Sequence, residues 1–213
     1  MRRNFRRGCG MSAPHQDARL TRLRSPELND QGPRLVLVGP MGAGKSTVGR
    51  LVAETLDVAF RDSDAEIERE AGRAIPEIFA TDGERHFRAL EERVIARLLT
   101  SHSGVLALGG GAVTSSATRE RLRDVTVVYL ALDSAHAPER IGSGGGRPVL
   151  AGGDPHARWV SVSRAREPFF TEVATWVLDT NGAAPKDLAS VLVRELCKRS
   201  TLLESEGTAH DES

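Results

Sequence analysis

The stretch LVLVGPMGAGKSTVGR, residues 35–50, constrains the fold more strongly than any other part of the sequence. Four apolar residues predict a buried strand, and the pattern G-x-x-x-x-G-K-[ST] follows at the start of a predicted helix. The residues that satisfy this pattern are Gly39, Gly44, Lys45 and Ser46. Glycines let backbone N–H groups converge on an anion, and the helix N-terminus adds partial positive charge. The stretch therefore predicts a loop that binds the phosphates of ATP or GTP.

Within this loop, we expect Lys45 to reach the β- and γ-phosphates and the Ser46 hydroxyl to ligate magnesium. The predicted nucleotide-binding residues of the loop are Gly42, Ala43, Gly44, Lys45, Ser46 and Thr47. The alternative is a glycine-rich turn with a surface lysine. The motif alone also serves kinases, motors and switches alike, so the reaction has to be inferred from other residues.

Short apolar runs alternate with longer helical patterns along the middle of the chain. The predicted strands are 34–38, 58–60, 105–108, 125–130 and 175–179, and the predicted helices include 45–56, 116–123, 134–141, 155–174 and 185–199. A further helix is indicated by apolar residues at helical spacing from Phe87 to Leu99. This alternation predicts an α/β fold with a mainly parallel, doubly wound sheet, whose ligand site lies outside the carboxyl ends of the strands.

We expect one domain over 33–200, flanked by polar tails at 1–32 and 201–213 that lack the apolar periodicity needed to form a core. The first tail is arginine-rich, which leaves open an organelle-targeting peptide, a true start at Met11 or a neutral extension. Both tails are predicted to be disordered.

Composition excludes several classes of partner. The 29 basic residues match the 29 acidic ones, so no global charge favours nucleic acid or an anionic membrane. No apolar run is long enough to span a bilayer, and the six histidines include no pair at zinc-ligand spacing. Two cysteines, Cys9 and Cys197, suit a reducing compartment. We therefore expect a cytoplasmic protein.

Two carboxylates follow the weak strand at 58–60, in FRDSDAEIE. There, Asp62 and Asp64 would lie near the phosphate-binding loop, where they could hold magnesium and accept the proton of an attacking hydroxyl. The alternative is structural, because Ser63 and Glu66 have the spacing of a capping box at a helix N-terminus.

A glycine run and three arginines complete the candidate site. GGGAV, residues 109–113, would let the backbone approach a small ligand with its amides free, unless it is only a loose turn. Arg88 borders the apolar helix face, where an ion pair with Glu84 is the alternative. Arg147 lies in the glycine-rich segment IGSGGGRPVLAGGDP, a candidate mobile lid at about 142–156, and Arg166 lies on the following helix. A solvated surface position is the alternative for each arginine.

Taken together, these segments resemble the shikimate kinases. The resemblance rests on GPMGAGKSTVGR, DSD, IFATDGERHFRALEE, LGGGAV, RPVL and REPFF, in unbroken order from about Arg34 to Arg194. It implies a three-layer P-loop kinase fold with a five-stranded parallel sheet, a substrate-binding helical region and a mobile lid. It also implies that ATP phosphorylates the 3-hydroxyl of shikimate, with Mg²⁺ as the cofactor and the protein a monomer that binds neither nucleic acid nor membrane.

The resemblance also implies roles for single residues. Asp62 would reach the metal through water, Asp64 would hold shikimate and act on its 3-hydroxyl, and Arg147 would act catalytically on the γ-phosphoryl group. The implied shikimate-binding residues are Asp64, Arg88, Gly109, Gly110, Gly111 and Arg166. The nucleotide would also contact Arg147 and Arg140, the latter stacking on adenine.

The sequence departs from the family pattern at three places. The candidate lid is unusually rich in glycine, Phe170 replaces the usual tyrosine of R-x-P-x-Y, and Gly182 stands where several members have a basic residue beside the nucleotide. Two other functions stay open from the residues alone, namely a gluconate kinase and an ATP-dependent switch with no acceptor. A switch would not need Asp64, Arg88 and Arg166 in one pocket.

Overall fold

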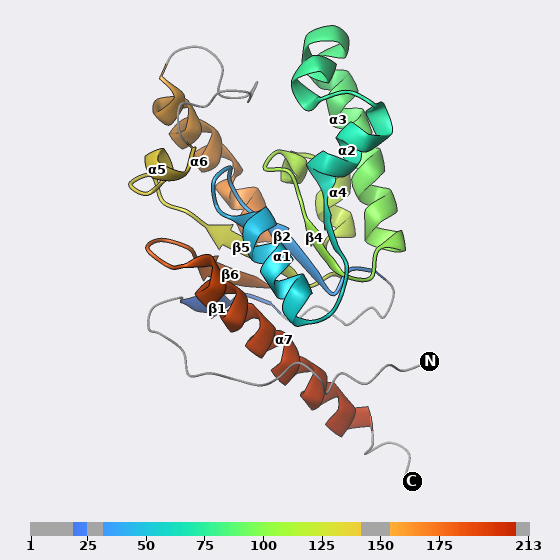
Figure 1. The fold of residues 1–213 in the computed structure, drawn as a ribbon, viewed down its shortest axis with the longest axis vertical. Helices are drawn as coiled ribbons and strands as arrows, with labels where there is room; N and C mark the ends of the chain where they lie inside the picture. The colour runs from blue at the N-terminus through green and yellow to red at the C-terminus, as the bar shows by residue number, and fades with distance from the viewer. Residues whose placement is uncertain (1–18, 25–31, 142–153, 208–213) are drawn as a thin grey trace.

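A computed structural model describes residues 19–24, 32–141 and 154–207, which form a six-stranded sheet with helices on both faces (Figure 1). The strand order is β1-β6-β5-β2-β4-β3. The strands are β1 (Leu20–Arg22), β2 (Leu35–Val38), β3 (Phe60–Asp62), β4 (Val105–Ala107), β5 (Val127–Ala131) and β6 (Trp176–Asp179). Five of them are parallel, and β1 pairs antiparallel with β6. The parallel α/β architecture predicted from the sequence is confirmed.

Seven α-helices and one short 3₁₀-helix fall within the described residues. They are α1 (Lys45–Thr55), α2 (Ser63–Ala71), α3 (Ile75–Ser101), the 3₁₀-helix η1 (Ala112–Thr114), α4 (Ser116–Arg121), α5 (Ala137–Ile141), α6 (Pro155–Val173) and α7 (Pro185–Gly207). A kink at Gly83, where φ is 81°, divides α3 into two helical segments. The α2 helix and the first turns of α3 form the helical region that stands beyond the sheet edge (Figure 1).

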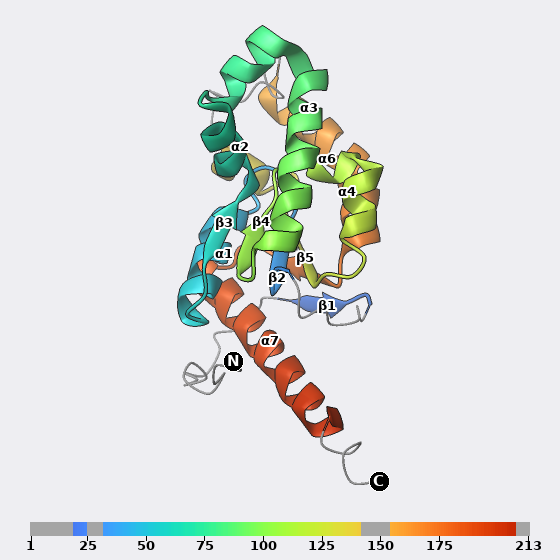
Figure 2. The same cartoon turned by 90° about the vertical axis from the view of Figure 1, so that its right-hand side faces the viewer.

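The alternation of side chains along the central strand builds two cores. Leu35 and Leu37 pack with α1 and α7 on one face, whereas Val36 and Val38 pack with α3, α4 and the end of α6 on the other. All four side chains are buried, because helices cover both faces of a parallel sheet. Figure 2 shows the central strands between α1 and α7 on one side and α4 on the other.

Three loops that carry candidate site residues leave the carboxyl ends of neighbouring strands. The phosphate-binding loop follows β2, Asp62 ends β3, and Gly109 lies two residues beyond β4. Because β4 pairs with both β2 and β3, these three loops meet at one edge of the sheet. The topology therefore places the site where the sequence pattern predicted it.

The sheet has one strand more than predicted, and that strand comes from the tail expected to be disordered. The prediction of disorder over 1–32 is wrong for β1, which pairs with Trp176–Leu178 of β6. Just beyond β1, the Arg24 guanidinium donates to the carbonyl oxygens of Leu122, Arg123, Val125 and Val173. A three-residue strand has no periodicity to read, and its partners are distant in sequence, so local pattern could not find it. Residues 1–18 and 25–31 lie outside the described residues.

Two other boundaries also differ from expectation. Helix α7 continues to Gly207, so the prediction of disorder from residue 201 is wrong over 201–207, where leucine and glutamate favour helix propagation. The end of the predicted lid belongs to α6, because Asp154 caps that helix by accepting from the His156 N–H. Most of the lid, 142–153, lies outside the described residues. Among those described, no helix has both the length and the apolarity needed to cross a membrane.

Candidate active site

The phosphate-binding loop is a tight turn between β2 and α1. Gly39 has a φ of 145°, and a side chain there would collide with the Leu130 carbonyl of the neighbouring strand β5, so the position requires glycine. The Lys45 ammonium group donates to the carbonyl oxygens of Gly39 and Pro40, each at 2.9 Å. The Ala43 amide donates back to Pro40 at 3.3 Å. These bonds curl the loop around the lysine, as expected of a phosphate cradle.

Asp62 links the phosphate-binding loop to α2. One carboxylate oxygen accepts a 2.6 Å hydrogen bond from the Ser46 hydroxyl, and the other accepts from the Asp64 amide at 3.0 Å. Asp62 is therefore the N-cap of α2, and the capping box expected as the alternative at Ser63 does not form. The buried Ser63 hydroxyl instead accepts a hydrogen bond from the Gly109 amide at 2.8 Å.

Asp64 lies in the first turn of α2 and faces the same cavity as the phosphate-binding loop. Burial raises the pKa of its carboxyl group to about 6, and the neighbouring negative charge of Asp62 adds to that rise, while Lys45 opposes it. A carboxylate whose pKa lies just below neutrality is ionised at pH 7 yet can hold a proton, as a general base requires. Its position and its pKa both suit a group that receives a proton from a substrate hydroxyl.

Two arginines line the same cavity, and their positive charges lie close enough to interact. Arg88 of α3 pairs with Glu91 at 2.6 Å and with Glu84 at 3.2 Å. Arg166 of α6 donates to the Gly110 carbonyl at 3.1 Å. Burial lowers the pKa of Arg166, and the nearby positive charge of Arg88 lowers it further. Two guanidinium groups that repel each other form a site suited to an anion such as a carboxylate.

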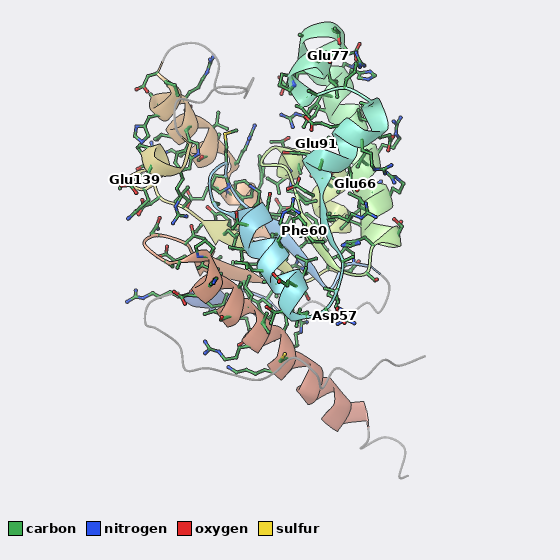
Figure 3. The ribbon with its side chains drawn as sticks, in the orientation of Figure 1. Asp57, Phe60, Glu66, Glu77, Glu91 and Glu139 are labelled. Carbon is green, nitrogen blue, oxygen red and sulfur yellow. The ribbon has the colours of Figure 1, made fainter. Side chains whose placement is uncertain are left out.

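Glu91 is a site residue that the sequence reasoning missed. It is 4% exposed, and burial raises its pKa although Arg88 and Arg166 act in the opposite direction. In Figure 3 it lies in the interior of the molecule, whereas Glu77 and Glu139 lie at the periphery. The sequence feature that could have identified Glu91 is its position three residues after Arg88, on the apolar face of the helix. Its ion pair orients the Arg88 guanidinium.

The glycine run lies between the carboxylates and the arginines. A side chain on Gly109 would collide with the Asp64 carboxylate, and one on Gly111 would collide with the Arg88 guanidinium. Glycine at these two positions therefore leaves room for the Asp64 carboxylate and the Arg88 guanidinium. The expectation of free amides is wrong at Gly109, because its N–H donates to Ser63. All three residues, Gly109, Gly110 and Gly111, line the cavity.

These loops and helices enclose a cavity of about 440 Å³. Its lining includes Gly42, Lys45, Ser46, Asp62, Asp64, Arg88 and Arg166, together with Gly44 and Thr47 of the phosphate-binding loop. Most of the predicted site residues are thus brought together by the fold. The volume suits a small polar ligand beside a phosphate group.

Two predicted nucleotide-binding arginines are not placed against a ligand site by the structure. Arg140 of α5 donates to the Thr180 hydroxyl at 3.2 Å and to the Thr180 carbonyl at 2.7 Å, beyond β6. Its stacking on adenine stays a prediction. Arg147 lies outside the described residues, so its catalytic role also stays a prediction.

The fold and site together define a P-loop kinase that acts on a small molecule. A phosphate-binding loop with its lysine and serine lines the same cavity as a carboxylate and two arginines, a combination that suits phosphoryl transfer to a small anionic acceptor. Comparison with known proteins identifies the kinase further. The family model described as shikimate kinase matches residues 41–197, and the chain belongs to the shikimate kinase family.

Similar proteins support this assignment over most of the chain. A shikimate kinase from Rhodococcus jostii strain RHA1 is 45% identical over 166 residues, which cover 78% of this chain and 99% of the relative. One from Saccharopolyspora erythraea is 49% identical over 164 residues, covering 77% and 94%. The structure of the Acinetobacter baumannii shikimate kinase in complex with shikimate superposes with a TM-score of 0.75 at 39% identity, covering 79% and 94% of the two chains.

Proposed function

We propose that this protein transfers the γ-phosphoryl group of ATP to the 3-hydroxyl of shikimate, giving shikimate 3-phosphate and ADP in aromatic amino-acid biosynthesis. The observation that carries the proposal is a single cavity lined by the phosphate-binding loop, the Asp64 carboxylate and the guanidinium groups of Arg88 and Arg166. Family membership supports the same reaction, and the relative from Acinetobacter baumannii is a complex with shikimate.

The acceptor end of the cavity matches the chemistry of shikimate. A planar guanidinium can bond both oxygens of a carboxylate, and those of Arg88 and Arg166 both line the cavity. Asp64, which also lines the cavity, would accept hydrogen bonds from the ring hydroxyls. The glycine run lets the ring approach the backbone, since a side chain on Gly109 would displace Asp64 and one on Gly111 would displace Arg88.

The donor end matches ATP with Mg²⁺. The Ser46 hydroxyl and the Asp62 carboxylate lie 2.6 Å apart, so they supply two adjacent hard oxygen ligands of the kind that magnesium prefers. Ser46 would bind the ion directly and Asp62 through water. When bound with ATP, magnesium would neutralise phosphate charge. Among the described residues no cluster of three or more metal-binding side chains forms, which accords with an ion held mainly by nucleotide and water.

The transfer needs little covalent help from the protein. The 3-hydroxyl oxygen forms a bond to the γ-phosphorus while the bond from that phosphorus to the bridging oxygen of ADP breaks. Asp64 takes the hydroxyl proton, and Lys45 stabilises charge on the transferring group once phosphate draws its ammonium away from the Gly39 and Pro40 carbonyls. Arg147 would add positive charge to the γ-phosphoryl group, and Arg140 would stack on adenine. We also propose a monomer located in the cytoplasm.

The direct test measures ADP release in the presence of Mg²⁺ and a panel of small hydroxy acids. We expect rapid ADP release with shikimate and at most slow release with gluconate or with no acceptor. Rapid release with gluconate alone would favour the gluconate kinase that the sequence left open. Slow, acceptor-independent hydrolysis would favour a nucleotide-dependent switch.

Replacing Arg88 with lysine is expected to raise the KM for shikimate by about 10- to 100-fold and to leave the KM for ATP within about twofold. Lysine keeps a positive charge beside the buried Glu91, but it loses the planar fork that bonds both carboxylate oxygens. Arg85→Lys is the matched control, because Arg85 is exposed on the same helix. Unchanged shikimate kinetics in Arg88→Lys would contradict the role of Arg88 in binding the carboxylate.

A further inference from the structure

One contact joins α6 to the phosphate-binding loop. The indole N–H of Trp159, in the second turn of α6, donates to the Met41 carbonyl oxygen at 2.9 Å. Trp159 is 3% exposed and packs into the core on the α1 face of the sheet. A buried hydrogen bond of this kind holds its acceptor in one orientation, because breaking it would leave a polar group unpaired.

The acceptor belongs to the peptide unit between Met41 and Gly42. The peptide bonds of the described residues are trans, so the carbonyl and the N–H of this planar unit point in opposite directions. Fixing the Met41 carbonyl toward Trp159 therefore fixes the Gly42 N–H on the side of the peptide away from the indole. Gly42 has a φ of 83°, and a glycine samples both signs of φ at little cost. Without an external contact, this peptide could rotate easily.

We propose that Trp159 is a positioning residue, which orients the Gly42 N–H so that it can donate a hydrogen bond to phosphate. This inference rests on the proposed function, since the anion in question is the triphosphate of ATP. Gly42 and Trp159 both line the cavity, and Lys45 of the loop bonds the carbonyls of Gly39 and Pro40, whereas the indole bonds that of Met41. The indole keeps the loop in its binding conformation before the nucleotide arrives, which reduces the ordering cost of binding.

The same helix contacts the acceptor site at a separate point. Arg166 donates to the Gly110 carbonyl, and it lies seven residues after Trp159, about 10 Å along the helix. A change confined to the indole N–H should therefore affect ATP and spare shikimate. That separation distinguishes positioning of the loop from a general loss of packing.

The test is Trp159→Phe, which keeps an aromatic ring and removes the donor. We expect the KM for ATP to rise about three- to tenfold, with kcat and the KM for shikimate within about twofold of the original values. The matched control is Trp176→Phe. Trp176 is 1% exposed in the same core, and within the described residues its indole N–H has no hydrogen-bond partner. This variant loses the same atoms without losing such a bond, so its KM for ATP should not change.

A second measurement does not require Trp159→Phe to be stable. In the ¹⁵N-labelled native protein, the Trp159 indole resonance, identified as the one retained in Trp176→Phe, should shift on addition of ADP with Mg²⁺. The proposal is overturned by an unshifted Trp159 resonance at saturating ADP, or by an unchanged KM for ATP in a folded Trp159→Phe. If shikimate-dependent turnover is intact in either case, only the role of Trp159 fails. If the native protein releases no ADP with shikimate, the proposed function fails as well.

Discussion

Replacing Lys45 with alanine is expected to lower kcat for shikimate phosphorylation by about a thousandfold or more. Lys45 follows the loop glycines directly and is the loop's cationic side chain, and its ammonium already lies within 2.9 Å of two loop carbonyls. Charge builds on the phosphoryl oxygens during transfer, so a fixed positive charge stabilises the transition state more than it stabilises bound ATP. The loss should therefore appear mainly in kcat.

Lys45→Met provides a second variant that keeps an unbranched stem, which separates loss of charge from loss of packing. The control is Lys186→Ala, since Lys186 is exposed in the first turn of α7. Thermal unfolding of each variant would show whether the loop remains folded. If folded Lys45→Ala retains kcat within about tenfold of the original value, the assigned role of Lys45 is wrong.

Replacing Asp64 with asparagine is expected to lower kcat by about 100- to 10,000-fold and, in the same protein, to increase stability at neutral pH. The loss of activity follows from the loss of the carboxylate that we propose accepts the hydroxyl proton. The gain in stability has a different origin. Burial and the nearby Asp62 raise the pKa of Asp64 from its usual 3.8 to about 6. Ionisation of Asp64 therefore lowers the free energy of unfolding of the protein.

The pH dependence follows from that direction of shift. Well below pH 4, Asp64 is protonated in both the folded and the unfolded chain and costs nothing. Between pH 4 and 6 the unfolded chain loses this proton first, so the cost develops, and above pH 6 it is complete. Relative to the original protein without nucleotide or magnesium, Asp64→Asn should gain about 1 to 3 kcal/mol in the free energy of unfolding at pH 7.5.

Chemical denaturation at pH 7.5, 6, 5 and 4 would measure this gain, which should diminish toward pH 4. Asp57→Asn is the control, because Asp57 is exposed and asparagine tolerates its φ of 52°. A stability difference that does not change with pH would show that the Asp64 carboxyl does not ionise at a cost in the folded protein. Retained kcat would show that it is not the proton acceptor.

The parts of the site that could be predicted from sequence are those encoded by neighbouring residues. The phosphate-binding loop is a run of eight residues whose conformation depends on its own glycines, and Arg88 and Asp64 stand in short recognisable segments. The strand at 58–60 was placed two residues early, because β3 is short and only half-buried, so its apolar pattern is weak. Local patterns therefore predicted the candidate catalytic groups, which the fold brings to one edge of the sheet.

Contacts between distant segments could not be predicted in this way. Ser63 looked like a helix cap, but Asp62 takes that position, and the Ser63 hydroxyl accepts from Gly109, 46 residues away. The Trp159 contact with Met41 spans 118 residues. No periodicity or motif encodes such pairs, because each depends on how separate elements pack. Sequence reasoning identified the chemistry, whereas the supporting contacts required the fold.

The edge strand β1 also bears on how far the folded unit extends. The family model begins at residue 41, yet Leu20–Arg22 completes the sheet and Arg24 binds carbonyls at the ends of α4 and α6. A chain shortened to the segment shared with its relatives would expose the backbone donors and acceptors of β6. Unpaired strand edges recruit other chains, so such a protein would be prone to self-association. The segment that resembles the relatives is therefore shorter than the segment that has to be present for the sheet edge to be covered.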